Sequence, residues 1–323
     1  MSVGEALPGL RTIFFGTPAL AVPTLDALHA SGRHRPSLVV SQPSRPVGRG
    51  RTVRDPPVVR RARALELPIE QPETVRDVGF LDRLRALEPD VAVVVAFGQI
   101  FRKSLLALPR HGCLNLHASL LPRWRGAGPI QAAVAAGDET TGVTIMRMTR
   151  GLDAGPILLA DEMAIEPHET AAELGPRLAE RGAELMVEAL DRLAAGELVE
   201  VEQDPEGVTL APMLGREDGE VDWRLGAARL YDLWRAYQPW PGLTSRLGDR
   251  AVKLVEVALE DGAVELGQAP GTILGEAGDA LRVACGGGTI LRLLRLQRPG
   301  KRPVSGVDFR RGERLESGAR FGA

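Results

Sequence analysis

The amino-acid sequence predicts an α/β protein, in which a doubly wound, mostly parallel sheet is followed by a small β-barrel of OB-like type. Short β-rich apolar runs alternate with helical stretches from residue 11 to about 195, which is typical of strand–helix–strand units. The run DVAVVVA at 90–96 is unbroken, as expected of a central parallel strand covered on both faces. Beyond residue 240, short strands alternate with Gly-rich turns, and this spacing predicts a barrel.

The first half of the chain supplies the strands of the sheet. Expected strands cover 12–15, 38–41, 90–96, 112–117 and 143–148, with helices at about 18–29, 127–136 and 171–195. Such alternation implies right-handed crossover connections. Ligands of a doubly wound sheet bind beyond the carboxyl ends of its strands, so residues that follow these strands are the first candidates for a site.

The second half begins where these patterns end. After residue 197 the chain reads ELVEVEQDPEGVTLAP, which has neither helical nor strand periodicity. Beyond it, a helix is expected at about 225–236 and strands at 243–247, 252–258, 271–274, 281–284 and 289–296. Because 323 residues are more than one core usually serves, we expect two domains, 1–197 and 213–323, joined by a linker at 198–212.

The composition is that of a globular protein. Hydrophobic residues make up 44% and charged residues 25%, so wholesale disorder is not expected. Cys113 and Cys285 stand alone, and no cluster has metal-ligand spacing, so we expect free thiols and no metal. No secretory signal or bilayer-spanning apolar run is visible, which predicts a cytoplasmic protein with no membrane partner. No obligate protein partner is predicted, and a monomer is expected.

Charge is distributed unevenly along the chain. Residues 1–63 carry ten arginines and three acidic residues, and residues 281–323 carry ten basic and three acidic residues. Residues 64–212 are acidic, with 24 acidic against 13 basic residues. Two basic ends around an acidic middle favour a polyanionic partner. Only three of the 40 basic residues are lysine, which indicates a compositional bias, so clusters of arginines are informative and single ones are not.

Gly16-Thr17-Pro18 follows the first expected strand, where a dinucleotide fingerprint would lie. The segment is GTPALA rather than G-x-G-x-x-G, and no strand ending in Asp or Glu follows it. A nicotinamide or flavin site is therefore disfavoured, and a plain strand-to-helix turn is the preferred interpretation.

The segment CLNLHASLLPRWRGAGPI at 113–130 carries the strongest candidate site. Side chains alternate along a strand, so Asn115 and His117 point to the same side. A lone histidine is more often structural, but this one is paired with an asparagine at a strand end. An amide can donate a hydrogen bond to an oxyanion, and an imidazole can move a proton near neutral pH. The pair therefore suits attack on a carbonyl.

The segment GVTIMRMTRGLDAGPIL at 142–158 adds a carboxylate. Asp153 lies between Gly151 and Gly155, so taken alone it could be an ordinary turn aspartate. Beside the Asn-His pair it is the expected third member, which orients His117 and stabilises its imidazolium form.

No protein nucleophile accompanies these residues. Ser119 lacks the G-x-S-x-G context of an activated serine, and nothing around Cys113 indicates an activated thiolate. The nucleophile is therefore expected to come from the substrate, in a direct transfer.

The segment QPSRPVGRGRTVRDPPVVRRAR at 42–63 holds seven arginines and one acidic residue. Its Pro and Gly residues predict that the first part is a projecting loop, and a solvated loop in an Arg-rich protein is one interpretation. The other is recognition of a phosphate backbone, to which guanidinium groups are well suited. The basic C-terminal end favours the second. The candidate contacts are Arg45, Arg49, Arg51 and Arg54.

Together these motifs resemble the methionyl-tRNA formyltransferase family over nearly the whole chain. The matching segments are FFGTPALAVPTLDAL, QPSRPVGRGR, LNLHASLLPRWRGAGPIQAAVAAGDETTGVTIMRM, GLDAGPI, VDW, PWPG, PGTIL and PGKRP. The Asn-x-His-x-Ser-Leu-Leu-Pro and Leu-Asp-x-Gly segments alone are similar to the wider group of 10-formyltetrahydrofolate-dependent formyltransferases. That group includes enzymes acting on glycinamide ribonucleotide and on amino sugars, and the Arg-rich insertion and second domain favour the tRNA enzyme.

The resemblance implies a formyltransferase-type Rossmann-like domain, 10-formyltetrahydrofolate as co-substrate and initiator methionyl-tRNA as acceptor. The catalytic residues would be Asn115, His117 and Asp153. The folate site would comprise Ser119, Leu120, Leu121 and Pro122. The loop at 43–54 would reach the acceptor end of the tRNA, and the barrel would hold its acceptor arm.

The chain departs from the family pattern at four positions. Ala19 stands where the family usually has Asp, and Phe97 stands where Tyr is usual. Arg51 and Arg216 replace lysines and so keep the positive charge. Phosphate contact is expected to survive both replacements.

The implied chemistry is attack of the α-amino group of methionyl-tRNA on the formyl carbon, through a tetrahedral intermediate. Asn115 and His117 would stabilise the oxyanion, and His117 would relay a proton toward the departing folate nitrogen. An amino-sugar-nucleotide or glycinamide-ribonucleotide formyltransferase would share the three residues but would leave the seven arginines unexplained. A non-catalytic RNA-binding protein on an enzyme fold would need a broken Asn-His-Asp set, and here the set is whole.

Overall fold

The computed structural model describes residues 9–47, 52–264, 268–316 and 318–322. Contacts between Cα atoms divide the chain into two units. The first comprises Met1–Pro129, Thr140–Ala164 and Gly175–Ala211, and the second comprises Ile130–Glu139, Ile165–Leu174 and Pro212–Ala323. The second unit thus takes two short segments, 130–139 and 165–174, from within the range expected for the first domain, which the sequence patterns do not indicate.

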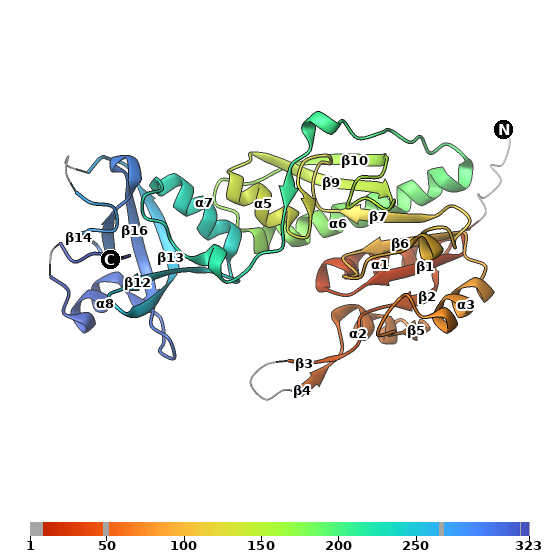
Figure 1. The fold of residues 1–323 in the computed structure, drawn as a ribbon, viewed down its shortest axis with the longest axis horizontal. Coiled ribbons are helices and arrows are strands. Elements are labelled where there is room, and N and C mark those ends of the chain that lie inside the picture. Colours follow the sequence, from red (N-terminus) through yellow and green to blue (C-terminus); the bar gives the residue numbers. More distant parts are fainter. Residues whose placement is uncertain (1–8, 48–51, 265–267, 317, 323) are drawn as a thin grey trace. The chain divides into compact units, whose positions relative to one another are not determined.

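The described part of the first unit is built on a seven-stranded sheet in the order β10–β9–β7–β6–β1–β2–β5 (Figure 1). Its strands are β1 (Thr12–Gly16), β2 (Pro36–Val40), β5 (Ile69–Glu70), β6 (Val91–Val95), β7 (Cys113–His117), β9 (Thr140–Arg147) and β10 (Ile157–Ala164). The strands from β7 to β5 pair in parallel, whereas β9 is antiparallel to both β7 and β10. The predicted doubly wound, mostly parallel sheet is confirmed.

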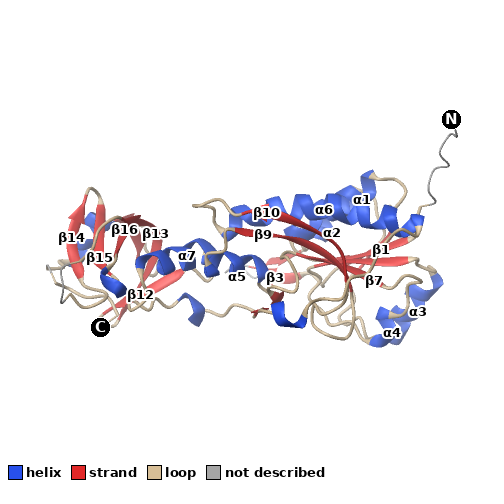
Figure 2. Ribbon diagram, turned by 90° about the horizontal axis from the view of Figure 1, so that it is seen from above, coloured by secondary structure: helices blue, strands red, loops and turns tan. Residues whose placement is uncertain are grey.

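Helices cover both faces of this sheet. Figure 2 shows α1, α2 and α6 on one face and α3 and α4 on the other. Their bounds are α1 (Val22–Ala30), α2 (Pro57–Ala64), α3 (Val78–Ala86), α4 (Lys103–Leu106) and α6 (Ala171–Ala195). α3 begins after Asp77, whose carboxylate accepts a hydrogen bond from the Phe80 backbone N–H at 2.7 Å. Phe80 and Leu105 then pack against the strands in one buried core cluster.

A hairpin projects from the first unit between β2 and α2 (Figure 1). Its strands are β3 (Arg45–Val47) and β4 (Thr52–Arg54), which pair antiparallel. They form the two ends of the expected projecting loop. Two of the candidate phosphate contacts, Arg49 and Arg51, lie outside the described residues.

The segment 198–212, expected to be a linker, is called the connector here. Its residue Val201 forms an antiparallel bridge with Ile157 at the start of β10. Further along, β11 (Leu210–Ala211) pairs in parallel with β8 (Arg125–Gly126). Most of the connector therefore packs as part of the first unit, and it does so against the loops that follow β7 and β9.

The second unit contains an antiparallel sheet in the order β12–β13–β16–β15–β14, with β17 beside β16. The strands are β12 (Leu243–Leu247), β13 (Arg250–Glu260), β14 (Ile273–Ala277), β15 (Ala280–Ala284), β16 (Ile290–Gln297) and β17 (Val304–Ser305). Its helices are α5 (Pro129–Ala136), α7 (Ala227–Tyr237) and α8 (Gly306–Glu313). The chain also forms four short 3-10 turns among its described residues. Two belong to the first unit, η1 (Ala19–Ala21) and η2 (Pro205–Gly207), and two to the second, η3 (Glu217–Gly219) and η4 (Gly286–Gly288).

The last residues of the chain join the two outer strands of this antiparallel sheet. The backbone N–H of Phe321 donates to Gly271 O at 2.9 Å, beside the start of β14. The next residue, Gly322, donates to Arg246 O on β12 at 2.8 Å. These bonds link the edges of the sheet, so the arrangement is consistent with the expected small barrel.

Candidate active site

Strand β7 brings Asn115 and His117 to one face of the sheet. Leu116, between them, points to the opposite face, where it packs closely against α6. A Cβ atom added to Gly182 of that helix would lie only 2.5 Å from Leu116 Cδ1. Asn115 and His117 are 9% and 5% exposed, at the carboxyl end of the strand. The predicted pairing of the two side chains on one face is therefore what the strand geometry produces.

The His117 ring is held by a backbone carbonyl. Its Nε2 lies 2.9 Å from Trp124 O, and because a carbonyl can only accept, Nε2 must donate. In the neutral ring the other nitrogen, Nδ1, is then unprotonated. Nδ1 lies 3.7 Å from Asp153 Oδ2, which is within ion-pair distance but longer than a hydrogen bond. Nδ1 is therefore the ring nitrogen whose lone pair is free, and it faces the Asp153 carboxylate.

Asp153 is fixed by both its backbone and its carboxylate. Its φ of +46° is the left-handed conformation, which costs a non-glycine residue about 1 kcal/mol or more. Its Oδ2 accepts a hydrogen bond of 2.9 Å from the Gly126 backbone N–H in β8. The loop conformation thus aims one oxygen at both Gly126 and the imidazole, and the structure brings the predicted histidine and aspartate together.

The amide of Asn115 makes no hydrogen bond with any residue that the structure describes. Asn115 is 9% exposed and its amide is not among the fully buried groups without a partner, so this unused donor beside His117 is open to a ligand. An N–H group held at such a position can stabilise an oxyanion that develops during a reaction.

Residues 119–122 form the turn that follows β7. Thr144 Oγ1 donates to Ser119 O at 2.7 Å and accepts from the Leu121 N–H at 3.1 Å. Ser119 is fully buried, and its hydroxyl donates to Arg123 O at 2.6 Å. Leu121 is also buried, whereas Leu120 and Pro122 are half-buried. Of the four residues expected at the folate site, only Leu120 and Pro122 therefore expose appreciable side-chain surface.

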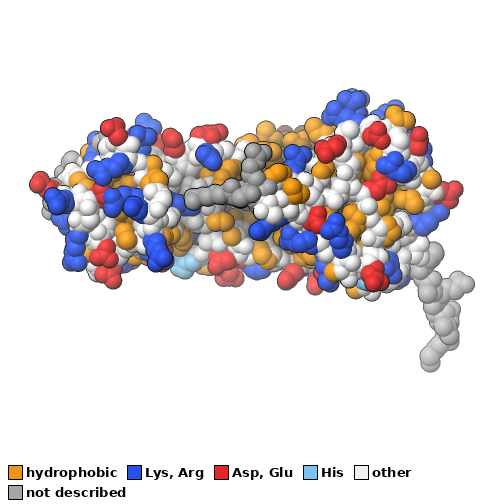
Figure 3. Space-filling model, turned by 90° about the horizontal axis from the view of Figure 1, so that it is seen from below, with side chains coloured by type: hydrophobic (Ala, Val, Ile, Leu, Met, Phe, Trp, Pro, Cys, Tyr) orange, Lys and Arg blue, Asp and Glu red, His pale blue; other side chains and the backbone are white. Residues whose placement is uncertain are grey.

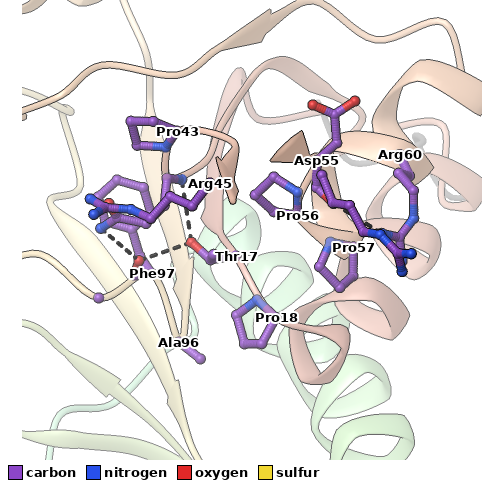
Figure 4. A pocket seen from close by; sticks show the side chains of 13 residues that line it. Thr17, Pro18, Pro43, Arg45, Asp55, Pro56, Pro57, Arg60, Ala96 and Phe97 are labelled. Carbon is purple, nitrogen blue, oxygen red and sulfur yellow. Dashed lines mark hydrogen bonds between the residues drawn. The ribbon is translucent and has the colours of Figure 1, made fainter. Parts of the chain in front are cut away.

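A cavity of about 690 Å³ lies at the carboxyl ends of β1, β2 and β6 (Figure 4). The chain leaves β1 toward β2 on one side and returns to β6 on the other, so this is the point where the strand order reverses and where ligands of such sheets bind. Its lining includes Thr17, Gln42, Arg45 and Phe97, but not the three candidate catalytic residues. Thr17 therefore belongs to a cavity wall, although its motif alone indicated only a turn.

The rim of this cavity is rich in positive charge. Arg45 lies directly opposite Arg54 in the β3–β4 pairing, and like charges in that position repel. Arg60 also lines the cavity. Asp55, the single carboxylate of this lining, accepts a hydrogen bond from Ser44 Oγ at 2.5 Å and pairs with Arg63. These contacts, the Ser44 bond above all, hold the pKa of Asp55 below its ordinary value.

Phe97 completes an aromatic cluster beneath the cavity. It is 2% exposed, and its ring centroid lies 5.3 Å from that of Phe15 and 5.9 Å from that of Phe101, all packed edge to face. Its carbonyl accepts hydrogen bonds from Thr17 Oγ1 at 2.9 Å and Gln42 Nε2 at 3.3 Å. The Phe97 ring therefore fills core space, packed against Phe15 and Phe101.

The two cysteines of the chain are not activated nucleophiles. Cys113 and Cys285 are free and buried, and burial raises the pKa of each thiol to about 12. The described residues contain no group of three or more His, Cys, Asp or Glu side chains placed to hold a metal ion. None of the described helices is long and apolar enough to cross a membrane.

Comparison with known proteins decides the family. Residues 10–190 match the formyl transferase family, and residues 213–314 match the formyl transferase C-terminal domain. The methionyl-tRNA formyltransferase of Acidobacterium capsulatum is 49% identical over 97% of this chain and 100% of that protein. That of Anaeromyxobacter dehalogenans is 48% identical over 94% of this chain and 97% of that protein. The chain belongs to the methionyl-tRNA formyltransferase family.

Solved structures share the fold of this methionyl-tRNA formyltransferase family member at low sequence identity. A sugar 3N-formyl transferase, crystallised with dTDP and 5-N-formyl-THF, matches with a TM-score of 0.66 and 13% identity over 92% of this chain and 100% of that one. HypX from Aquifex aeolicus, in complex with tetrahydrofolic acid, matches with a TM-score of 0.61 and 15% identity over 94% of this chain and 47% of that one. These likenesses show a common fold.

Gly126 lies in tight contact with the connector, where β8 pairs with β11. Its φ is +126°, and a Cβ there would lie 2.3 Å from Ala211 O. Gly126→Ala is expected to push β8 from β11, to destabilise the protein by about 1–3 kcal/mol and to lower kcat, since β8 holds Asp153. Thermal unfolding and kcat are measured beside Gly196→Ala, a control with φ of +72° and no atom within 4 Å of the added Cβ. Equal effects of the two substitutions would contradict this role of Gly126.

Proposed function

We propose that this protein transfers the formyl group of 10-formyltetrahydrofolate to the α-amino group of initiator methionyl-tRNA. Its family membership supports the reaction, and one observation carries the site. At the end of β7, His117 presents Nδ1 at 3.7 Å from Asp153 Oδ2 while Trp124 O holds Nε2. The unpartnered Asn115 amide is placed two residues away on the same face. Formyl transfer requires such a donor and such a base.

The proposed chemistry uses the three side chains in distinct roles. The amine of methionyl-tRNA forms a new C–N bond at the formyl carbon, and the bond from that carbon to N10 of the folate breaks. Asn115 donates a hydrogen bond to the oxygen of the tetrahedral intermediate. His117 accepts at Nδ1 the proton that the attacking amine loses, and then donates it to N10 of the departing folate, so that protons balance. Asp153 stabilises the imidazolium that exists between these two transfers.

The charged surfaces support an RNA acceptor. The rim arginines, Arg45 and Arg54, repel one another unless anions lie between them. In the second unit, Figure 3 shows Lys and Arg side chains spread over the visible face. Its exposed basic residues include Arg246, Arg250, Arg295, Lys301, Arg302, Arg311, Arg314 and Arg320. We propose that the cavity takes the acceptor end of the tRNA and that this unit holds its acceptor arm.

The two rim arginines are expected to contribute to affinity rather than to chemistry. Arg45→Ala with Arg54→Ala should weaken tRNA binding and lower the slope of log Kd against log salt by about 1–2, because two phosphate contacts are lost. Filter binding at several salt concentrations measures both effects, with Arg110→Ala, an exposed arginine outside the rim, as control. An unchanged salt slope would remove the hairpin from the tRNA site.

The proposed functions assign a role to each part of the chain. We propose that 1–197 forms the catalytic domain and 213–323 the tRNA-binding domain, with 198–212 between them. With methionyl-tRNA as the acceptor, we place the reaction in the cytoplasm and expect the protein to act as a monomer.

The test of the proposed function is direct formylation. The protein is incubated with 10-formyltetrahydrofolate and charged initiator tRNA, and N-formylmethionine is measured after hydrolysis. Glycinamide ribonucleotide and an amino-sugar nucleotide serve as competing acceptors. Formyl transfer to either of these, and not to the tRNA, would reject the proposed acceptor. No transfer to any of the three would reject the reaction itself.

A further inference from the structure

Gln203 is a buried glutamine of the connector to which the reaction assigns no part. It is 9% exposed. Its Nε2 donates hydrogen bonds to two carbonyls, Asp153 O at 2.8 Å and Gly155 O at 2.7 Å. Its Oε1 accepts from Arg125 Nε at 3.0 Å and Arg125 Nη2 at 2.7 Å. One side chain thus ties the loop that carries Asp153 to β8, the strand that binds the Asp153 carboxylate.

The orientation of this amide is fixed by its partners. Both loop groups are carbonyls, which only accept, and a guanidinium only donates. The nitrogen of Gln203 must therefore face the loop, and its oxygen must face Arg125. Two hydrogen bonds on each side use the whole hydrogen-bonding capacity of the amide toward these partners. An amide satisfied in this way has a single orientation, as a positioning group requires.

The Asp153 loop needs such support. Asp153 itself adopts φ of +46°, and the preceding residue, Leu152, is 69% exposed. Gly155 packs so closely that an added Cβ would meet the carbonyl of Arg147. Without the bonds from Gln203, two carbonyls of this loop lose their partner, and the strained backbone at Asp153 is free to relax toward common conformations.

The same connector also positions the group on the other side of the histidine. Thr209 Oγ1 accepts from the Trp124 backbone N–H at 2.8 Å, and Thr209 O accepts from the Arg125 N–H at 2.9 Å. Trp124, with φ of +63°, supplies the carbonyl that receives His117 Nε2. Both partners of the imidazole are therefore held by the connector, since Thr209 comes 85 positions after Trp124 and Gln203 comes 50 positions after Asp153.

We propose that Gln203 is a positioning residue of the formyl-transfer centre. It acts through Asp153: by holding the two loop carbonyls it keeps Oδ2 facing His117 Nδ1, so that the imidazolium formed during transfer is stabilised. The inference rests on the proposed function for its kinetic consequence. Its geometric consequence, the placement of Asp153 beside His117, stands apart from the identity of the acceptor.

Two substitutions separate this role from that of a simple anchor. Gln203→Ala removes both sets of hydrogen bonds. Gln203→Glu keeps an acceptor for Arg125 but replaces the donor to the loop with an oxygen that faces two carbonyls. An anchor that acts through Arg125 would survive in the glutamate variant, whereas the positioning role would be lost in both. Glu202→Gln, at the exposed neighbouring position, is the matched control.

The kinetic result expected is a selective loss of kcat. Both Gln203 variants should lower kcat about tenfold to a hundredfold, with KM for folate and tRNA changed by less than about twofold, because only the alignment of reacting groups is lost. In an Asp153→Asn background the same substitutions should cost nothing further, since the residue through which Gln203 acts is already disabled. Full activity of Gln203→Glu, or an equal loss of kcat in both backgrounds, would overturn the proposal.

A second measurement does not depend on turnover. The chain has five histidines, so the imidazole ¹H–¹⁵N signals of His117 can be assigned by comparison with His117→Gln. Gln203→Ala should shift those signals and leave the other four in place, because Asp153 moves away from Nδ1. Unchanged His117 signals would overturn the positioning role even in an active enzyme. If the wild-type protein formylated no methionyl-tRNA but Gln203→Ala still shifted the His117 signals, the proposed acceptor would be rejected and this inference retained.

Discussion

Replacing His117 with alanine is expected to lower kcat for formyl transfer by about 10²- to 10⁴-fold, the range that a positioned general acid–base contributes. Nδ1 is the one ring nitrogen free to exchange a proton, because Nε2 is engaged by Trp124 O at 2.9 Å. No other described imidazole lies against Asp153. Affinity for tRNA should stay nearly unchanged, since the arginines proposed to bind phosphate are untouched.

The measurement is single-turnover formylation at saturating substrates, with tRNA affinity determined separately. His111→Gln is the matched control, because His111 precedes the same strand and uses its carbonyl, not its ring, to bind Arg147. We expect the control to keep wild-type kcat. A His117→Ala protein that transfers formyl groups at a wild-type-like rate would sink the assignment of the base.

Replacing Asp153 with asparagine is expected to lower kcat by about 10²- to 10³-fold, as for a lost electrostatic partner of a transition-state charge. Asparagine tolerates the left-handed backbone seen at φ of +46°, and its carbonyl oxygen can still accept from the Gly126 N–H. The substitution therefore removes the charge that faces His117 while the loop is retained. Asp153→Ala, which also loses the bond to Gly126, should be at least as slow.

The comparison that tests this charge is with Asp204→Asn. Asp204 is an exposed carboxylate of the connector that likewise accepts from a backbone N–H, that of Glu206 at 2.9 Å, but it pairs with no histidine among the described residues. Its variant should keep wild-type kcat. If both asparagine variants were equally active in transfer, the Asp153 carboxylate would have no electrostatic part in the reaction.

The central strands were predictable because burial on both faces leaves a mark on the sequence. β6 is Val91–Val95, with all five residues buried, inside the run expected at 90–96. β8 and β11 have two residues each, too few for any periodicity, and exist only because they pair with each other. β10 is a longer edge strand in which buried and exposed residues alternate only in part. Such elements depend on tertiary contacts that a local pattern does not contain.

The site divides in the same way. The period of a strand placed Asn115 beside His117, and a glycine-flanked loop marked Asp153. The groups that orient them are the Trp124 carbonyl, the Gly126 N–H and a glutamine in a segment without periodicity. Every residue carries a backbone carbonyl, so the sequence gives no sign of which one receives Nε2. The cavity at Thr17 was missed for a related reason, since its wall is assembled from three separate strand ends.

The pairing of β11 with β8 shows that the end of the sheet fold and the end of the segment that supports the active site are different positions, although the sequence suggests a single boundary. The sheet of the first unit is complete once α6 ends at Ala195, so by topology a self-sufficient fold could stop there. The hydrogen bonds that hold Asp153 and the Trp124 carbonyl beside His117 come from positions 203–211. In evolutionary terms, an exchange of the C-terminal part of the chain between relatives keeps the residues that hold His117 and Asp153 only if the crossover falls after Ala211. A segment that looks like a linker between two domains can thus belong, in evolution, to the catalytic part of the chain.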